Sequence, residues 1–527
     1  MMSTTRSTNQ VRFTAILIGV LMMPVHSYWI SRIEAIVYKG SGGSTSSLIW
    51  TSVYNMVVLL VIFRLIQRFW SKLALHRAEL LAIFSMCNIA ACVAGHDLIQ
   101  ILIPLITYPQ WYASSENEWA RILLPYLPAG ITVKDKSALL RYFVGESTFY
   151  NKLHLLAWQW PFLCWSGFIA LLLCVSLAIN VIVAKQWINT DRLSYPVIQL
   201  PYQLSAPSWQ FFKDRLVWLG IATSGLILSI NHLNRIFPQI PIIPLRIDLN
   251  RYLTESPWNA IGWTPFNIIF NYIGLGFFVP VDILFSCWFF LLTFKIQQIL
   301  GKIIGFQGLP NFPYSYEQSS GGYLAVSLIA LWLTRRHLKW EAETLFGDTE
   351  SSIYRLAVLT VIIGLGGLIL FCSYLGISVW VAVAFFLTYY LIQIAIGRMR
   401  AEIGTPLHDL HFGGPSTILM NAFGSRRFTH STLVGLAQLW CVDRAYRSNA
   451  APHQLETLKI AERIKASPIG FICTMIVACL LAGPMAIWAM LPAMRLVFRM
   501  RLLSTSTLVE KHGCGFSRGR PTPVKQT

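Results

Sequence analysis

Charged residues are scarce in this sequence. Asp, Glu, Lys and Arg make up 12% of the 527 residues, whereas hydrophobic residues make up 55%. Soluble domains carry roughly 25% charged residues, and the chain contains many apolar runs of about 18 residues or more, the length that crosses a bilayer. In lipid only helices and closed barrels satisfy the backbone, and runs of this length form helices. The sequence therefore predicts an all-α, polytopic transmembrane helical bundle.

Acidic residues are the rarer of the two charged classes. The chain has 23 Asp and Glu against 42 Lys and Arg, a formal net charge of +19. The basic residues cluster between apolar runs, as they do in cytoplasmic loops of membrane proteins. We therefore expect no nucleic-acid partner. The expected partners are the lipid bilayer and a small-molecule substrate, and a homodimer is left open.

Several enzyme and metal motifs are also missing. The ten cysteines include no C-x-x-C pair, and the chain has no H-E-x-x-H, no G-x-S-x-G and no phosphate-cradling G-x-x-x-x-G-K-[ST] loop. These absences argue against a zinc knuckle, a disulfide framework and an ATP-driven pump. We expect no catalytic residue and no cofactor, and secondary transport is favoured over primary transport.

Hydropathy predicts about 11 to 13 spans. The expected spans are 13–31, 47–67, 80–107, 156–184, 215–233, 263–278, 280–300, 321–335, 356–376, 378–396 and 468–492. The run 428–441 is short and polar, and is expected to be re-entrant or to lie along the membrane surface.

The basic clusters also predict the orientation. They fall on one side if the N-terminus is cytoplasmic and residues 263–300 cross twice. We therefore expect a cell (inner) membrane protein with residues 1–12 as a cytoplasmic tail. The long segments 108–155 and 234–262 are then external.

A single membrane domain is expected over 13–500, with pseudo-repeated halves near 13–233 and 263–492. Residues 501–527 are basic and rich in Ser and Gly, which predicts a disordered tail. Eleven spans place this tail outside, against the positive-inside rule. Either a further segment crosses or re-enters, or the tail is non-native and follows a truncation.

Ionisable groups inside apolar runs are the first candidate site residues, because they are costly in lipid. "CVAGHDLIQIL" places His96 and Asp97 inside the third span, where they are suited to a proton relay or to cation binding. The alternative is that the helix ends near Gly95 and leaves both residues at the external interface.

A second candidate is "FNIIFNYIGLGFFVPVDILF". Asn267 and Asn271 are four residues apart and are predicted to share a helix face, after which glycines and a proline break the run before Asp282. Broken helices build substrate and ion sites in transporters. The alternative is an external hairpin in which Asp282 only stabilises a helix N-terminus.

Two proline-punctuated segments follow cytoplasmic helix ends. In "DRLSYPVIQLPYQL" extended backbone is expected before each proline, including Tyr195 before Pro196. In "GRMRAEIGTPLHDLHFGGP" Arg398 and Glu402 are spaced to pair along a helix. The similar placement of the two segments favours two related halves, and the Arg–Glu–Gly–Pro core is predicted to be half of a paired cytoplasmic gate.

The histidines of the second segment are weak metal candidates. His408 and His411 are three residues apart, but the spacing fixes no third strong ligand. No metal site is therefore expected.

The motifs "RLSYPVIQLP", "IGLGFFVPVDILFSCWFF" and "RMRAEIGTPLHDL" together resemble a bacterial multipass membrane family of unassigned function. That family is distantly similar to the oligopeptide transporter family. The resemblance covers most of residues 10–490 and implies a secondary transporter of peptides or metal chelates, often proton-coupled. It also implies further helices where this chain has its basic tail. By motif match, the positions implied to matter are Tyr195, Pro196, Asp282, Arg398, Glu402, Gly404 and Pro406.

Three hypotheses follow. The first is an ion-coupled secondary transporter of a small organic solute, with His96, Asp97 and Asp282 as coupling groups. The second is a membrane-embedded enzyme that acts on a lipid-linked substrate, with His96 or His408 as base. The third is a non-catalytic membrane scaffold, in which these polar residues only join helices.

Overall fold

The structure is a computed structural model that describes residues 10–37, 43–67, 69, 75–144, 150–206, 210–344 and 352–511. Helices dominate, and the described residues contain one two-stranded sheet. The helices are α1 (Phe13–Val37), α2 (Trp50–Gln67), α3 (Arg77–Ala94), α4 (Ile99–Trp111), α5 (Trp119–Ile122), α6 (Lys136–Val144), α7 (Lys152–Lys185), α8 (Gln199–Leu204), α9 (Gln210–Lys213), α10 (Arg215–Ile236), α11 (Phe270–Gly276), α12 (Val281–Ile304), α13 (Ser315–Thr344), α14 (Ser352–Tyr374), α15 (Val379–Glu402), α16 (Pro415–Phe423), α17 (His430–Gln438), α18 (Trp440–Asp443), α19 (Ala451–Arg463) and α20 (Pro468–Lys511). The strands are β1 (Arg246–Asp248) and β2 (Pro265–Asn267).

The predicted all-α membrane bundle is confirmed. Among the described residues, nine helical stretches are long and apolar enough to cross a bilayer. They are Phe13–Glu34, Trp50–Gln67, Arg77–Trp111, Lys152–Thr190, Arg215–Ile236, Val281–Ile304, Ser352–Tyr374, Val379–Glu402 and Pro468–Leu491. The predicted span 321–335 lies within α13, a helix of 30 residues that is not among the nine.

One predicted span is wrong. Residues 263–278 hold the short strand β2 and the seven-residue α11, which is too short to cross a bilayer. Asn267 therefore lies in a strand and Asn271 in a helix, so the two do not share a helix face. The reason is strand pairing, because β1 pairs antiparallel with β2 and places Arg246 opposite Asn267. The predicted break before Asp282 is present, with Pro280 capping α12.

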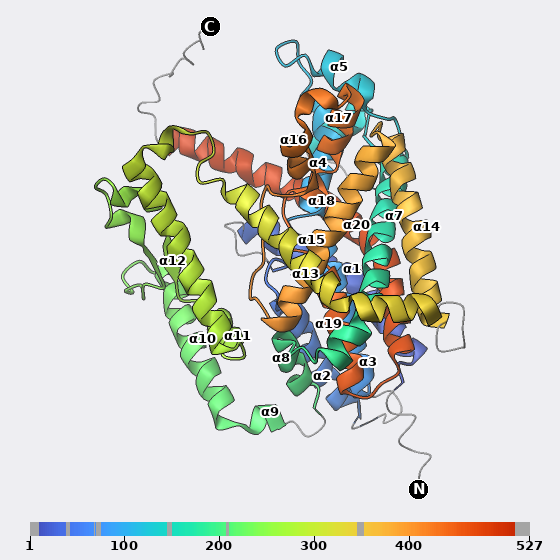
Figure 1. The fold of residues 1–527 in the computed structure, drawn as a ribbon, viewed down its shortest axis with the longest axis vertical. Helices are drawn as coiled ribbons and strands as arrows, with labels where there is room; N and C mark the ends of the chain where they lie inside the picture. Colours follow the sequence, from blue (N-terminus) through green and yellow to red (C-terminus); the bar gives the residue numbers. More distant parts are fainter. Residues whose placement is uncertain are drawn as a thin grey trace.

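The short, polar run 428–441 forms short helices. It contains α17, with nine residues, and the start of α18, with four. Together with α16, these short helices lie over the upper part of the bundle in Figure 1. Non-helical backbone between short helices at membrane depth is tolerated only where protein or water surrounds it. This part of the chain is therefore a candidate for the lining of a polar site inside the bundle.

The bundle core is formed by α1, α3, α7, α14, α15, α19 and α20, which pack against one another. The close approach of α7 and α14 depends on glycine. A Cβ on Gly364 would collide with the Cγ2 atom of Val175, and one on Gly367 would lie 3.0 Å from the Cδ1 atom of Leu171. Small residues at such crossings let two membrane helices pack backbone to backbone.

The helices α10, α11 and α12 form an arm beside the bundle, drawn in green at the left of Figure 1. The most apolar windows of α10 and α12 have no buried residue. This arm carries Asp282 in the first turn of α12, well separated in the chain and in its contacts from the bundle core.

The segment between α1 and α2 reaches into the interior. The Ser47 N–H donates to the Pro406 carbonyl at 2.9 Å, and the Ser47 carbonyl accepts from Arg400 at 2.9 Å. Ser44 contacts the hydroxyl of Ser448 at 3.1 Å. We call residues 43–49 the hairpin tip. It joins the start of the chain to segments about 350 to 400 residues further on.

We expect Gly364→Ala to lower the thermal stability of the protein in detergent, measured by the temperature at which tryptophan fluorescence changes. The new Cβ overpacks against the short, branched Val175, and overpacking costs about 1 to 3 kcal/mol. Gly366→Ala is the matched control, because a Cβ there meets open space and gains helix propensity of about 1 kcal/mol. Equal stability of the two variants would contradict this packing.

Candidate functional site

Two interruptions of the helical chain meet inside the bundle. The first is Gly95–Leu98 between α3 and α4, and the second is the stretch 444–450 between α18 and α19. Gly95 fits only as glycine, because a Cβ there would fall on the hydroxyl of Ser44 and lie 3.0 Å from that of Ser448. The two interruptions and the hairpin tip therefore touch at one place.

Asp97 and Arg447 form an ion pair across these interruptions. The Arg447 Nη2 atom donates to Asp97 Oδ1 at 2.7 Å, and its Nε atom donates to Oδ2 at 3.2 Å. The backbone N–H of Ser448 also donates to Oδ2 at 3.3 Å. Asp97 is only 3% exposed. A buried charge is stable only when it is paired and hydrogen-bonded, and Asp97 meets both conditions.

The pair lies near the middle of the bundle, beside a set of neutral polar side chains. Gln393 accepts from the Ser176 hydroxyl at 2.8 Å, and it donates to the Tyr389 hydroxyl at 3.0 Å and to Asn449 at 3.3 Å. At 1.5 Å of rise per residue, Gln393 is about 21 Å from the start of α15 and about 14 Å from its end. These contacts join α7 and α15 to the second interruption.

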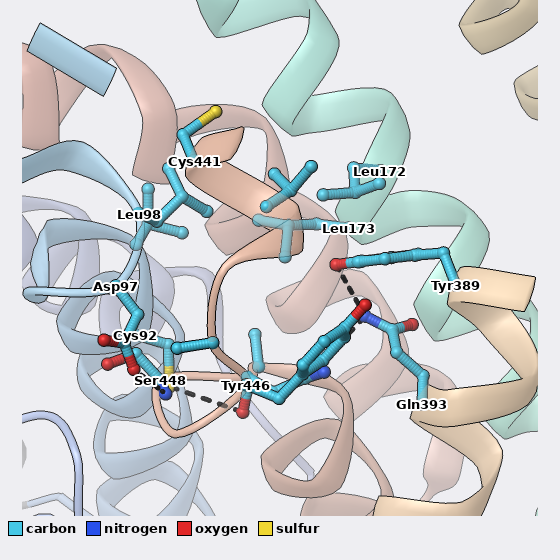
Figure 2. Close-up of a pocket in the computed structure, with 15 residues that line it drawn as sticks. Cys92, Asp97, Leu98, Leu172, Leu173, Tyr389, Gln393, Cys441, Tyr446 and Ser448 are labelled. Carbon is cyan, nitrogen blue, oxygen red and sulfur yellow. Dashed lines mark hydrogen bonds between the residues drawn. The ribbon is translucent and has the colours of Figure 1, made fainter. Parts of the chain in front are cut away.

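A cavity of about 30 Å³ lies between the ion pair and this network. Figure 2 shows Asp97 and Ser448 on one side of it and Tyr389 and Gln393 on the other. Its wall also contains Leu98 and Ala450, the capping residues at the starts of α4 and α19. The volume suits about one or two water molecules, so in this conformation the site is closed to an organic solute.

Segment 404–450 carries several buried polar atoms that make no hydrogen bond within the described structure. They include Asp443 Oδ2, Gln438 Oε1, the Tyr446 hydroxyl and Arg444 Nη1. Burial raises the pKa of Asp443 to about 6. Each unsatisfied buried polar atom costs about 1 to 3 kcal/mol, so this segment offers unpaired donors and acceptors to a polar ligand.

Asp409 extends the ion pair. Its Oδ2 atom lies 3.5 Å from Arg447 Nε and 3.4 Å from His411 Nδ1. Burial raises the pKa of Asp409, against the opposing effect of Arg447. The group thus contains two carboxylates, Asp97 and Asp409, that share one arginine.

A second buried ion pair lies between α15 and α19. Arg400 Nη2 lies 2.7 Å from both carboxylate oxygens of Glu456, and its guanidinium is also 3.2 Å from His453 Nε2. Burial alone would raise the pKa of Glu456, but Arg400 holds it below its ordinary value. Burial and Arg400 lower the pKa of His453 to about 4. A cavity of about 10 Å³ adjoins Glu456 and His453.

The two proline-punctuated segments are neighbours in the structure. The Tyr195 N–H donates to the Ala401 carbonyl at 2.8 Å, and the Ser194 hydroxyl donates to the Glu402 carbonyl at 2.9 Å. Gly404 has a φ of +67°, and a Cβ there would lie 2.6 Å from Pro196. Only glycine at position 404 allows the Gly-x-Pro stretch to pack this closely against Pro196. The carbonyl of Pro406, in the same stretch, accepts a hydrogen bond from the hairpin tip.

The predicted Arg398–Glu402 pair is confirmed at 3.1 Å, and Arg398 also pairs with Asp191 at 2.6 Å. The backbone expected before the prolines is wrong. Tyr195 has a φ of +47°, because its N–H bonds to α15, and Leu200 lies within the helix α8 before Pro201.

The other predicted residues lie elsewhere. Asn267, Asn271 and Asp282 are exposed on the α10–α12 arm. His408 is 4% exposed, and burial and Arg400 lower its pKa. The described residues contain no cluster of three or more His, Cys, Asp or Glu suited to a metal ion.

Sequence reasoning missed Arg447, Arg400 and Glu456 as site residues, and also Glu34. Arg400 belongs to one of the basic clusters that predict the orientation, and Arg447 and Glu456 lie in a polar stretch outside every predicted span. The available signal was Glu34, an acidic residue at the end of the first apolar run.

One family model, described as a family of unknown function, matches residues 5–509. No curated protein matches the chain, and no solved structure does. The match bears out the expected multipass group of unassigned function and carries no link to the oligopeptide transporter family.

We expect Arg400→Met to destabilise the protein by about 3 to 5 kcal/mol, because it leaves the Glu456 carboxylate buried without a partner. Arg400→Met combined with Glu456→Leu should recover most of this loss. Chemical unfolding in detergent measures both. Glu402→Gln is the control, since Glu402 is exposed and exposed changes stay within about 0.5 kcal/mol. A double variant no more stable than Arg400→Met would refute the buried pair.

Proposed function

The chain belongs to this family of unknown function, DUF6785, over residues 5–509, and we propose that it is an ion-coupled secondary transporter of a small organic solute. Because the family has no known function, the proposal is argued from the residues of this chain. The observation that carries the proposal is the meeting of two interrupted helical segments at the Asp97–Arg447 pair, near the middle of the bundle. Transporters build substrate and ion sites from such interrupted helices at the bilayer midplane.

The helix starts at the cavity support this assignment. The first turns of α4 and α19 begin at the cavity wall, and each helix has 13 residues. The N-terminus of a helix carries a partial positive charge and unpaired N–H groups, which favour an anionic group. The Ser448 N–H, two residues before the cap of α19, also donates to the Asp97 carboxylate.

The charges suggest a peptide-like solute. Arg447 and Asp97 form a fixed cation and anion side by side. When the pair opens, the guanidinium suits the carboxylate of a zwitterion and the Asp97 carboxylate suits its ammonium group. A metal chelate that carries both charges would fit the same pair. The closed cavity requires that segment 404–450 moves before either solute enters.

The neighbouring segments at 194–196 and 398–406 form the proposed gate. In the orientation we propose, the N-terminal tail lies in the cytoplasm beneath a bacterial inner membrane, and neither residues 263–278 nor α13 crosses the bilayer. The two segments then follow four and eight spans, so this gate is on the cytoplasmic side. Arg398, held between Asp191 and Glu402, bridges the two segments. Partly exposed ion pairs are weak individually, which suits contacts that must open and close.

No observation favours the alternative hypotheses over transport. A membrane enzyme that used His96 or His408 as base would need that histidine at the wall of the reaction cavity. Neither residue lines the central cavity.

We expect Asp97→Asn to abolish solute uptake at normal membrane abundance. Without the carboxylate charge, the ammonium-binding group and one of the two carboxylates that share Arg447 are lost. The assay uses full-length protein in proteoliposomes that contain a pH-sensitive dye, and challenges them with a panel of amino acids, di- and tripeptides and metal chelates. Solute-dependent acidification of the lumen is the signal.

Asp282→Asn is the matched control, because Asp282 is an exposed carboxylate on the α10–α12 arm. It should transport at the wild-type rate. Uptake that survives Asp97→Asn, or that is lost equally in both variants, would remove Asp97 from the transport site.

A further inference from the structure

Glu34 is a buried carboxylate that the ion pairs described above do not use. It lies near the end of α1 and is 2% exposed. Its Oε1 atom accepts from the backbone N–H and the hydroxyl of Ser44, at 2.9 and 2.7 Å. Its Oε2 atom accepts from the Gln100 amide at 2.9 Å. Within the described structure, these donors are all neutral.

The charged and titratable groups that face Glu34 form no ion pair with it in the described structure. From the first interruption come Asp97, whose charge acts on Glu34, and His96, whose backbone N–H donates to it. Arg447 of the second interruption is bound to Asp97, and on α1 itself the neighbouring charged residue in sequence is Arg32. The charged residues of α3, Arg77 and Glu79, lie at the opposite end of that helix from Gly95. Helix α20 has no Asp, Glu, Lys, Arg or His between 468 and 491.

The nearby arginines have other contacts. Arg447 binds both oxygens of Asp97 and approaches Asp409. The guanidinium of Arg32 lies over the ring of Tyr28, 4.8 Å from its centroid. A deeply buried carboxylate without a cation, and with a second carboxylate nearby, favours its neutral acid form.

From this geometry we infer that Glu34 is a proton-binding site, and that the coupling ion of the transporter is a proton held on its Oε2 atom. The second half of this statement rests on the proposed function, whereas the first half does not. Binding is a simple protonation. A hydronium ion transfers a proton to the carboxylate oxygen and leaves as water, so one O–H bond breaks as the other forms.

Gln100 allows the site to accept both forms of Glu34. Its amide lies between Glu34 and the partly exposed His96, whose Nδ1 atom is 3.3 Å from Gln100 Oε1. An amide can turn over and exchange its N–H₂ and oxygen positions. In one orientation it donates to the ionised carboxylate, and in the other its oxygen accepts the proton of the acid.

Ser44 connects the proton site to the ion pair. Its hydroxyl donates to Glu34 and is 3.1 Å from the hydroxyl of Ser448, whose N–H binds Asp97. Loss of the proton places a second negative charge beside Asp97. That charge competes for Arg447 and shifts the balance between the closed and open pair, which is how proton binding would reach the solute site.

The test is infrared difference spectroscopy of the full-length protein in lipid nanodiscs, titrated between about pH 5 and pH 9, the range that contains shifted carboxylates. The carbonyl stretch of a carboxylic acid is separate from the carboxylate bands. Asp409 and Asp443, whose pKa values are raised by burial, also contribute acid bands. We therefore expect Glu34→Gln to remove one component of the wild-type titrating band and to leave theirs. Glu79→Gln is the matched control, because Glu79 is equally buried but ion-paired with Arg12 at 2.5 Å. The spectrum of the Glu79→Gln variant should therefore keep the Glu34 acid band.

An acid band that persists unchanged in Glu34→Gln overturns the proposal. If this variant does not fold, Gln100→Leu provides the test. It removes one donor to the ionised form, so the acid band should persist to higher pH than in the wild-type protein, and an unchanged titration overturns the proposal. The spectra require no solute. Failure of uptake with a normal Glu34 band would therefore reject only transport, whereas intact uptake without the band would reject only the proton site.

Discussion

The buried ion pair of Asp97 and Arg447 is the constraint on which the interior of this protein depends. A carboxylate that is 3% exposed inside an apolar bundle is stable only with a cation and further donors. Both partners lie where the helices are interrupted, so backbone N–H groups there can donate hydrogen bonds to the carboxylate. The glycine at position 95 lets the hairpin tip approach, and the Ser448 N–H completes the coordination. The interruptions and the charges thus stabilise each other.

The second ion pair has a different character. Arg400 and Glu456 are bonded through both carboxylate oxygens, and Arg400 also donates to the hairpin tip. This pair joins α15 to α19 and is fully satisfied, which is typical of a structural connection. Around Asp97, in contrast, one arginine serves two carboxylates and nearby polar atoms lack partners. Under the proposed transport mechanism, the part that moves is therefore the surroundings of Asp97, and Arg400 is its rigid support.

Local features were predictable from the sequence, and distant partners were not. Spacing alone predicted the Arg398–Glu402 pair, and cost in lipid alone singled out Asp97. Its partner Arg447 lies 350 residues away, in a polar stretch whose burial only the folded bundle determines. Asn267 was misassigned because hydropathy cannot show that a strand pairs with residues 246–248. The backbone at Tyr195 was misjudged for the same reason, since a bond to α15 overrides the local preference before proline.

The most direct test of the central claim is the reactivity of Cys441. This residue is 2% exposed and lines the same cavity as Asp97. In a chain whose other nine cysteines are replaced, out of ten, a small polar maleimide should alkylate Cys441 slowly. Asp97→Asn weakens the pair that closes the cavity. A loss of about 1.4 kcal/mol in the stability of the closed state raises the population of the open state about tenfold. Alkylation at least about tenfold faster is expected, and equal rates would show that the pair does not control access.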